Sequence, residues 1–282
     1  MKIQSAGRLG NQLFVFGHAL DLKMNSGVES VGIFADKFHS RRDKELFTTF
    51  NLLSNQGVKF TINNWLGFLL KVIDKLNLNS KKTSGLIRRI LRIQTETEDV
   101  LTKHAWIQRG FFQEEPLPEN VLIRMNEILT ATLKSDVLQQ SLRAKMPFLL
   151  GEYQAIHVRR TDFFSTELGV IDPKSQLDSL QNGLKVVICT DATKEEISNK
   201  VDITDFEVIT PAESTAWETL AVLSGANYLV MSNSTLSYWA GFVASKAGKN
   251  VCAPTVWNKQ KKEPMRLPYH CQSHYAPAFE NL

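Results

Sequence analysis

The sequence predicts an α/β protein built from two Rossmann-like halves. Apolar runs rich in β-branched residues alternate with segments of helical periodicity, which is the pattern of β-α units around a parallel sheet. The pattern restarts after a break at residues 147–151, and a chain of 282 residues has room for two domains of ordinary size. We therefore expect one domain over residues 1–148 and a second over residues 149–282, facing each other across a cleft.

In the first half, residues 11–25 are expected to be helical because apolar side chains recur at helical spacing and give the segment one buried face. These side chains are Leu13, Phe16, Leu20 and Met24. The expected strands of this half are residues 2–5, 28–35 and 105–112. The other expected helices are residues 65–76, 120–133 and 135–145.

In the second half, short apolar runs alternate regularly with helical segments, as successive β-α units require. The expected strands are residues 153–158, 185–190, 206–209, 227–231 and 250–253. The expected helices are residues 193–200, 216–225 and 234–247.

The composition is that of a folded protein with a modest positive charge. Hydrophobic residues make up 43% of the chain and charged residues 22%, which excludes disordered and fibrous architectures. The formal net charge of +4 is too small for a dedicated nucleic-acid binder, so any basic partner site must be local. The longest apolar stretch, within residues 65–73, contains Lys71 and falls short of the ~18 residues of a membrane-spanning helix.

Cysteine usage and the first residues of the chain indicate the compartment. Cys189, Cys252 and Cys271 are odd in number and widely spaced, so they suggest neither a disulfide framework nor a zinc site. The amino-terminal residues lack the basic stub and apolar segment of an export signal. We therefore expect the protein to reside in a reducing cytoplasm.

Residues suited to chemistry follow three of the expected strands, where open α/β sheets place their ligands. The first group is the turn Gly7-Arg8-Leu9-Gly10-Asn11-Gln12. Its backbone N–H groups and the amides of Asn11 and Gln12 could face a polar ligand. The alternative is a left-handed structural turn in which Asn11 caps the following helix. The spacing is neither that of a dinucleotide-binding turn nor that of a P-loop.

The second group, His157-Val158-Arg159-Arg160-Thr161-Asp162, ends the strand that opens the second half. Because side chains alternate along a strand, His157 and Arg159 share one face, and Arg160 shares the other with Asp162. We expect His157 and Arg159 to face a ligand, and Arg160 to be held structurally by Asp162. Arginine suits bidentate recognition of phosphate. The alternative is an exposed basic pair at a strand end.

The third group places hydroxyl side chains at the start of an expected helix, after Met231 and Ser232. Its members Asn233, Ser234 and Thr235 could seat an anion with the help of the helix dipole, or Asn233 or Ser234 could simply cap the helix. The chain has no D-x-D pair of the kind that holds a diphosphate through a divalent cation. We therefore expect no metal site, and expect arginine and the helix dipole to neutralise the charge of a diphosphate.

Together the three groups resemble motifs of the α-1,2-fucosyltransferases of bacterial surface-glycan synthesis. Residues 7–14 are similar to the family's G-x-L-G-N-Q-L-F, residues 157–162 to its H-x-R-R-x-D, and residues 233–239 to its N-S-S/T-F-S-W-W. Residues 109–113 and 253–257 are weaker echoes of its G-Y-F-Q and A-P-x-x-W segments. These similarities occur in the family's order and cover most of the chain.

The resemblance implies a GT-B fold and an inverting, metal-independent transfer of L-fucose from GDP-fucose to the 2-OH of a terminal β-galactoside, in a surface glycan such as O-antigen. The first domain would take the acceptor and the second the GDP-sugar, with no cofactor besides this donor substrate. The resemblance implies two catalytic residues: Arg159, which would bind the β-phosphate and stabilise the leaving GDP, and Asn11, which would lie across the cleft near the sugar. His157 would contact the nucleoside, and Ser234 and Thr235 would hold phosphate. The other residues assigned to the donor are Arg160, Asp162, Asp191 and Asn233, with Gly7, Gly10 and Gln12 as the glycine loop.

Some features depart from the family or leave roles open. The family's S-D-D becomes Thr190-Asp191-Ala192, so Asp191 keeps only one of the two carboxylates. Asp36, His39 and Asp162 are candidates for the base that takes the acceptor proton. Two alternative functions would use the same ligand-binding residues. One is transfer of another nucleotide-activated sugar, and the other is that of a non-catalytic module that binds a nucleotide sugar or a glycan.

Residues 71–92 form a basic stretch with seven Lys or Arg and one Asp, interleaved with Leu, Ile and Val. A solvated helix face is one interpretation. The other is peripheral docking to anionic lipid on the inner face of the cytoplasmic membrane, where a lipid-linked glycan acceptor would lie. Aromatic residues are not interleaved with these charges, so no nucleic-acid partner is expected.

Overall fold

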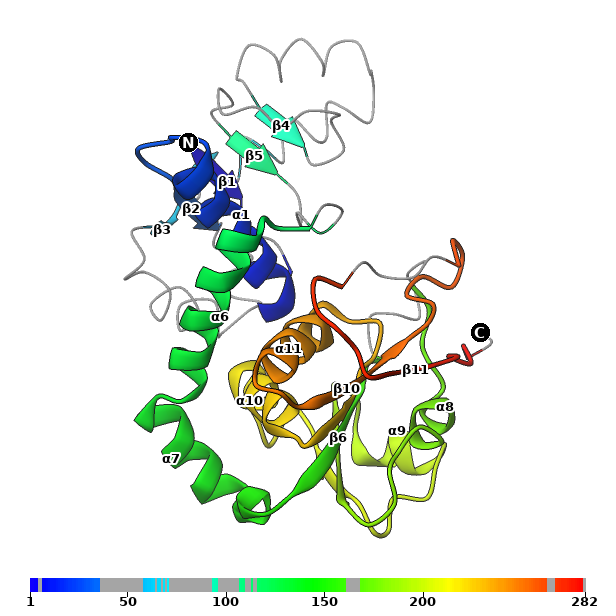
Figure 1. The fold of residues 1–282 in the computed structure, drawn as a ribbon. Helices are drawn as coiled ribbons and strands as arrows, with labels where there is room; N and C mark the ends of the chain where they lie inside the picture. The colour runs from blue at the N-terminus through cyan, green and yellow to red at the C-terminus, as the bar shows by residue number, and fades with distance from the viewer. Residues whose placement is uncertain are drawn as a thin grey trace. The chain divides into compact units, whose positions relative to one another are not determined.

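The computed structural model describes residues 1–4, 7–35, 58–63, 65–66, 68, 70, 93–95, 107–109, 113, 116–160, 168–262 and 267–280. The chain divides into two compact units, Met1–Met125 and Asn126–Leu282, and each unit has its own sheet (Figure 1). The candidate bases Asp36, His39 and Asp162 and the whole of the basic stretch 71–92 lie outside the described residues.

The first unit contains a five-stranded parallel sheet in the order β3-β2-β1-β5-β4. Helix α1 (Leu9–Asn25) connects the first two strands, and α6 (Glu119–Leu133) begins in this unit and continues into the second. The strand order reverses at β1, because β2 and β3 lie on one side of it and β5 and β4 on the other. The strands are β1 (Lys2–Gln4), β2 (Gly32–Ala35), β3 (Lys59–Ile62), β4 (Ile93–Thr95) and β5 (Ile107–Arg109).

The predicted helix over residues 11–25 is confirmed as α1, which begins at Leu9. Leu13, Phe16 and Leu20 are buried as predicted. Met24 is 44% exposed, so the predicted buried face is wrong at this residue. Residues 23–25 are all exposed, because the last turn of α1 extends beyond the core.

The second unit contains a six-stranded parallel sheet in the order β11-β10-β9-β6-β7-β8. Helices α10 and α11 cover one face, and α8 and α9 cover the other (Figure 1). The chain runs from β6 to β7 and β8 on one side of the sheet and then crosses to β9 and β10 on the other side. Because such crossovers are right-handed, the helices of the two runs cover opposite faces. The strands are β6 (Tyr153–Val158), β7 (Lys185–Thr190), β8 (Glu207–Ile209), β9 (Tyr228–Val230), β10 (Asn250–Pro254) and β11 (Ser273–Tyr275). The helices are α7 (Asp136–Lys145), α8 (Pro173–Leu177), α9 (Lys194–Ser198), α10 (Ala216–Gly225) and α11 (Thr235–Lys246), with a 3-10 turn at Pro147–Leu150.

Local sequence explains why these elements form where they do. All six residues of β6 are buried, as expected for a central strand covered on both faces. Thr193 and Thr215 begin α9 and α10 with capping boxes, in which each pairs with the Glu three residues later. The sequence missed α8 and β11, because Pro-Lys-Ser-Gln-Leu and Ser-His-Tyr are mostly polar and contain no apolar run, unlike the Tyr-Leu-Val of β9.

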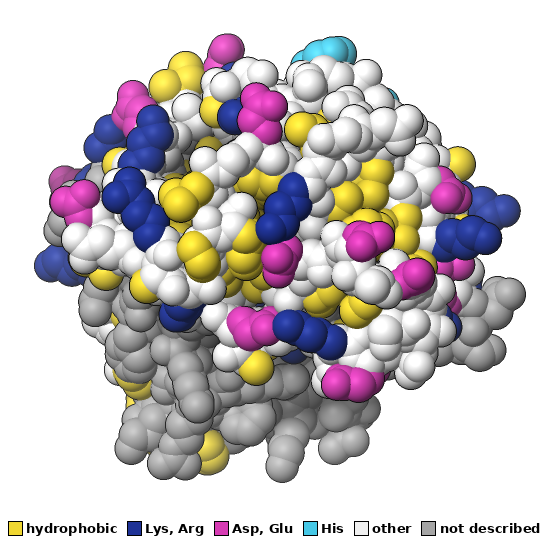
Figure 2. All heavy atoms as spheres, turned by 90° about the horizontal axis from the view of Figure 1, so that it is seen from below, with side chains coloured by type: hydrophobic (Ala, Val, Ile, Leu, Met, Phe, Trp, Pro, Cys, Tyr) yellow, Lys and Arg dark blue, Asp and Glu magenta, His cyan; other side chains and the backbone are white. Residues whose placement is uncertain are grey.

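The predicted α/β class with two Rossmann-like halves is confirmed, since each unit has its own parallel sheet. Contacts divide the chain inside α6, whereas the sequence places the boundary at residue 148, shortly before β6 begins the second sheet. In the described part of the chain, no helix has the length and apolar character needed to cross a membrane. On the face shown in Figure 2, basic and acidic side chains are interspersed, as a net charge of +4 leads one to expect.

Candidate functional site

The second sheet reverses its strand order at β6, and open α/β sheets bind ligands at such a point. Strands β6, β7 and β9 are parallel neighbours, so their carboxyl ends meet at one edge. Most of the predicted donor-site residues lie at or directly after these ends, so the structure brings them to the same edge. They are His157, Arg159 and Arg160 from β6, Asp191 after β7, and Asn233, Ser234 and Thr235 after β9.

His157 lies at the centre of a buried hydrogen-bond network. It is 2% exposed, and its Nδ1 lies 2.6 Å from Ser237 Oγ and 3.2 Å from Ser232 Oγ. Ser237 Oγ also accepts the backbone N–H of Ser232 at 3.0 Å. Burial, with a contribution from the charge of Arg159, lowers the pKa of His157 to about 4 against an opposing effect of Asp191. The ring is therefore neutral at pH 7 and ties β6 to the start of α11, through two serines that sequence reasoning did not select as site residues.

Arg159 is held by a carboxylate from the neighbouring strand end. Its Nη1 lies 3.0 Å from Oδ2 of Asp191, and the two side chains are 13% and 8% exposed. The other oxygen of this carboxylate, Oδ1, accepts the backbone N–H of Arg160 at 2.7 Å. Asp191 thus fixes both the guanidinium of Arg159 and the backbone that follows β6. A guanidinium held in this way loses little conformational entropy when it binds an anion.

Arg160 turns to a different carboxylate, that of Glu280. The pair joins Nη1 to Oε1 and Nη2 to Oε2, the second contact at 3.2 Å, and both side chains are nearly buried. The sequence predicts a structural role for Arg160 with Asp162 as its partner, but Asp162 lies outside the described residues. No local signal could reveal Glu280, because 120 positions separate it from Arg160.

The third group builds the junction between β9 and α11. Ser234 caps α11, since its Oγ accepts the backbone N–H of Leu236 at 3.3 Å. Asn233 is buried, and its Nδ2 donates to the carbonyls of Leu168 and Gly169 at 3.0 Å and to that of Trp257 at 3.1 Å. Asn233 therefore fastens two loops to this strand end. Thr235 opens the helix, whose amino-terminal dipole favours negative charge at this edge.

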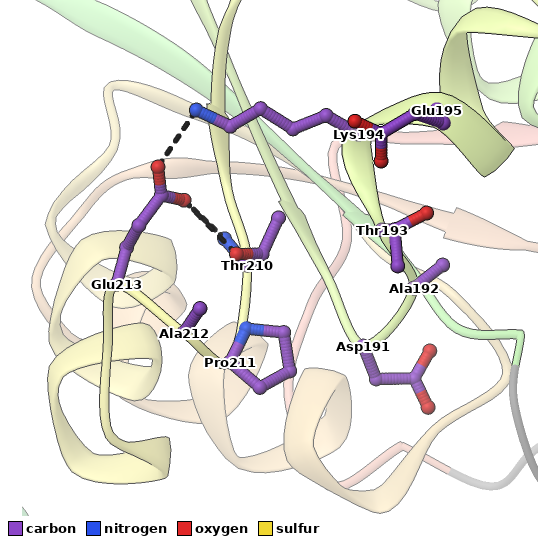
Figure 3. A pocket seen from close by; sticks show the side chains of 9 residues that line it. All are labelled: Asp191, Ala192, Thr193, Lys194, Glu195, Thr210, Pro211, Ala212 and Glu213. Atoms are coloured by element: carbon purple, nitrogen blue, oxygen red, sulfur yellow. Dashed lines mark hydrogen bonds and ion pairs between the residues drawn. The ribbon is translucent and has the colours of Figure 1, made fainter.

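A hollow of about 550 Å³ opens beside Asp191, at the carboxyl ends of β7 and β8 (Figure 3). Residues 191–195 and 210–213 line it. On one side, the carboxylate of Glu213 accepts the backbone N–H of Thr210 at 2.8 Å and lies 2.7 Å from Lys194 Nζ, and Asp191 stands on the other side. Residues 210–213 carry no motif, so sequence reasoning missed this part of the site.

The glycine loop lies at the reversal point of the first sheet, after β1. Gly7 has a φ of +72°, and a Cβ there would lie 2.2 Å from Asn11 Nδ2, so any other residue would be strained and would have to displace the Asn11 side chain. Asn11 Oδ1 accepts Gln113 Nε2 at 3.1 Å, which joins the turn after β1 to the segment after β5. Gln12 is buried, and its Nε2 donates to the Gly7 carbonyl at 3.1 Å.

The alternative interpretation of this turn, in which Asn11 caps the helix, is wrong at the cap. Helix α1 begins at Leu9 with Arg8 in the capping position, so Asn11 lies inside the helix and does not cap it. Gly10 is buried in the first turn of α1. The amide of Asn11 therefore serves the junction with Gln113 at the sheet edge.

Comparison with known proteins yields distant likenesses. No family model matches the chain, and no curated protein matches it. The glycosyl transferase family 9 protein of Veillonella parvula is 12% identical with a TM-score of 0.48, over 96% of this chain and 84% of that chain. Fucosyltransferase NodZ from Bradyrhizobium is 12% identical with a TM-score of 0.45, over 86% and 93%. The E. coli heptosyltransferase WaaC with ADP is 10% identical with a TM-score of 0.42, over 97% and 89%. At these identities and scores, the likeness does not define the family or activity of this chain.

Proposed function

We propose that this protein is an inverting, metal-independent glycosyltransferase that moves L-fucose from GDP-fucose to the 2-OH of a terminal β-galactoside, in a surface glycan such as O-antigen. One observation carries the proposal: the joined pair Arg159 and Asp191 lies at the reversal point of the second sheet, at the edge where α11 begins. The motif resemblance supports the choice of nucleotide, sugar and linkage. A GT-B arrangement of the two units is part of the proposal.

The charges at this edge support binding of a nucleoside diphosphate. The guanidinium of Arg159 and the amino-terminal dipole of α11 both favour an anion there. As the bond between fucose and GDP breaks, negative charge grows on the β-phosphate. A cation already held in place by Asp191 stabilises that charge without reorganisation, which is the usual origin of a large electrostatic contribution to catalysis. We therefore assign Arg159 to both donor binding and departure of GDP.

The hollow beside Asp191 supports a place for the nucleoside. In Rossmann-like sheets the diphosphate lies at the first βα turn, and an acidic residue after the second strand binds the ribose. Asp191 follows β7, the second strand of this sheet in chain order, and the hollow lies between the ends of β7 and β8. We assign the ribose to the side of Asp191 and the guanine to the side of residues 210–213.

In the proposed reaction, the acceptor 2-OH oxygen attacks the anomeric carbon of fucose from the face opposite GDP. The bond from that carbon to the β-phosphate oxygen breaks, and the hydroxyl proton passes to a base. A single displacement of this kind inverts the anomeric carbon. We assign Asn11 to the sugar, on the strength of the motif resemblance. Asp36, His39 and Asp162 stay candidates for the base.

Calorimetric titration tests the donor assignment. Protein in EDTA is titrated with GDP, UDP and ADP, and the same is done for Arg159→Ala and for Ala212→Trp, which fills the hollow. We expect GDP to bind most tightly and both substitutions to weaken its binding roughly a hundredfold or more. Lys185→Ala is the matched control, because Lys185 is an exposed residue at the opposite end of β7. Binding without preference for GDP, or binding indifferent to Arg159, would show that the donor class is wrong.

A transfer assay tests the sugar and the acceptor. Radiolabelled GDP-fucose and terminal β-galactosides should yield an α-linked product, with equal rates in the presence and absence of EDTA. Transfer from another GDP-sugar would favour the first alternative function. GDP binding without turnover on any acceptor would favour the non-catalytic binding module.

We also propose that the protein lies in the cytoplasm and docks to the inner face of the membrane through residues 71–92. The docking has its own test. Sedimentation with anionic liposomes should be lost when Lys81, Lys82, Arg88 and Arg89 are changed to Glu, because the attraction to anionic lipid depends on these charges. Sedimentation unchanged by the substitutions would leave the basic stretch as a solvated surface.

A further inference from the structure

The segment near the end of the chain, residues 278–280, is fastened to the second unit, and the proposed reaction does not use it. Asp172 N–H donates to the carbonyl of Ala278 at 2.7 Å, and Glu280 N–H donates to that of Val170 at 2.9 Å. Lys259 Nζ donates to the carbonyl of Glu280 at 2.8 Å. The backbone of Glu280 is thus held from two sides, which fixes where its carboxylate lies.

That carboxylate binds two cations of unequal burial. The side chains of Arg160 and Glu280 are 7% and 11% exposed, whereas that of Lys200, whose Nζ lies 3.0 Å from Glu280 Oε2, is 43% exposed. Burial raises the pKa of Glu280, but hydrogen bonds from Arg160 and Lys200 outweigh it and keep the pKa below its ordinary value. A nearly buried guanidinium needs its counter-charge, whereas an exposed ion pair contributes little. Arg160 is therefore the partner that depends on Glu280.

The carboxylate of Asp191 contacts both Arg160 and Arg159, the arginine assigned to the donor phosphate. Asp191 Oδ1 accepts the backbone N–H of Arg160, and Asp191 Oδ2 contacts the guanidinium of Arg159. A shift of Arg160 therefore moves a hydrogen bond on the same carboxylate that holds Arg159. If Arg160 lost Glu280, its guanidinium would be drawn toward the carboxylate of Asp191 and would compete there with Arg159.

We propose that Glu280 is a positioning residue for the donor site: by holding the guanidinium of Arg160 away from the carboxylate of Asp191, it keeps that carboxylate available to fix the guanidinium of Arg159. The proposal extends the function proposed above, and it assigns to the carboxyl-terminal segment a role in nucleotide affinity. Glu280 acts through Arg160 and Asp191 and does not contact the donor itself.

Hydrogen exchange tests the link from Glu280 through Arg160 to Asp191 without any nucleotide. The amide N–H of Arg160 is protected by Asp191 in the wild-type protein. In Glu280→Gln, residue-resolved exchange at Arg160 should become faster, while amides within β6 keep their protection and show that the unit is folded. Unchanged exchange at Arg160 would overturn the proposal. If Glu280→Gln does not fold, Glu280→Asp, which keeps the charge and shortens its reach, takes its place with the same expected direction.

Nucleotide affinity provides the second readout. Glu280→Gln should weaken GDP binding about tenfold, within the range of couplings that pass through packed networks. Adding Arg160→Met removes the displaced cation, so the double variant should recover most of this affinity, which a loss of mere structural support would not do. Glu207→Gln, a change in an exposed ion pair, is the matched charge control. Wild-type GDP affinity in Glu280→Gln, or no recovery of affinity in the double variant, would overturn the positioning role of Glu280. Failure of the wild-type protein to bind any nucleotide would overturn only the proposed function.

Discussion

The two sheets end in chemically different edges at the points where their strand order reverses. At the first edge the joined side chains are amides, Asn11 and Gln113. At the second edge they are ions, with Arg159 on Asp191 and Arg160 on Glu280. Amides both donate and accept hydrogen bonds, as sugar hydroxyls do, whereas a fixed guanidinium suits a phosphate. Both sheets are parallel and reverse their strand order at their first strand, so the residues that follow the strands make the two edges chemically different.

Alanine substitutions at the two edges should separate binding from transfer, and this is the largest expected effect. Arg159→Ala should weaken GDP binding by about 3 kcal/mol or more, roughly a hundredfold, because it removes the cation and leaves the carboxylate of Asp191 beside the phosphate. Asn11→Ala should leave GDP affinity within about twofold, as expected for an independent site, and should lower the transfer rate. Calorimetry and initial rates on both variants measure this. Similar losses of GDP affinity in the two variants would contradict the division between the edges.

The neutral histidine within the ionic edge predicts a pH dependence of stability. The pKa of His157 is lowered from 6.5 to about 4, so the unfolded chain binds a proton more readily than the folded one. Its contribution to the free energy of unfolding is fully present above pH ~6.5 and is lost as the pH falls through about 4, a change of about 3 kcal/mol.

Urea unfolding between pH 7 and pH 4 measures this contribution when wild type is compared with His157→Gln. The difference in unfolding free energy between the two proteins should shrink as the pH falls, because the glutamine does not titrate. A difference that stays constant with pH would mean that His157 is not held neutral in the fold.

Gly7→Ala probes the amide edge, with a somewhat smaller expected effect on stability. The positive φ and the close approach of Asn11 Nδ2 should together lower the free energy of unfolding by about 2 kcal/mol. Gly27→Ala is the matched control, because Gly27 has a φ of +63° in the same unit and no atom would lie within 4 Å of a Cβ there. The excess loss in Gly7→Ala over Gly27→Ala measures the contact with Asn11. Equal losses in thermal or chemical unfolding would show that Asn11 simply moves aside.

The residues at the second edge show what the sequence could and could not predict. Strand periodicity predicts that neighbouring arginines diverge, and Arg159 and Arg160 do take different carboxylates. Periodicity cannot name a partner that is distant along the chain, so Glu280 went unnoticed. Strands β3 and β4 were also missed, because Lys-Phe-Thr-Ile and Ile-Gln-Thr mix polar with apolar residues and lack the apolar run of β2, Gly-Ile-Phe-Ala.

The smallest expected effect concerns the ion pair that flanks the hollow. Lys194 and Glu213 are 2.7 Å apart, but their side chains are 49% and 42% exposed, so Lys194→Ala should change the free energy of unfolding by less than about 0.5 kcal/mol. Lys145→Ala offers a contrast, because its partner Glu218 is only 3% exposed and would be left with an unbalanced buried charge. That variant should lose about 1–3 kcal/mol. Chemical unfolding of both variants ranks them. A loss in Lys194→Ala as large as that in Lys145→Ala would mean that the pair beside the hollow is shielded from water, and that the second edge is ionic well beyond its two arginines.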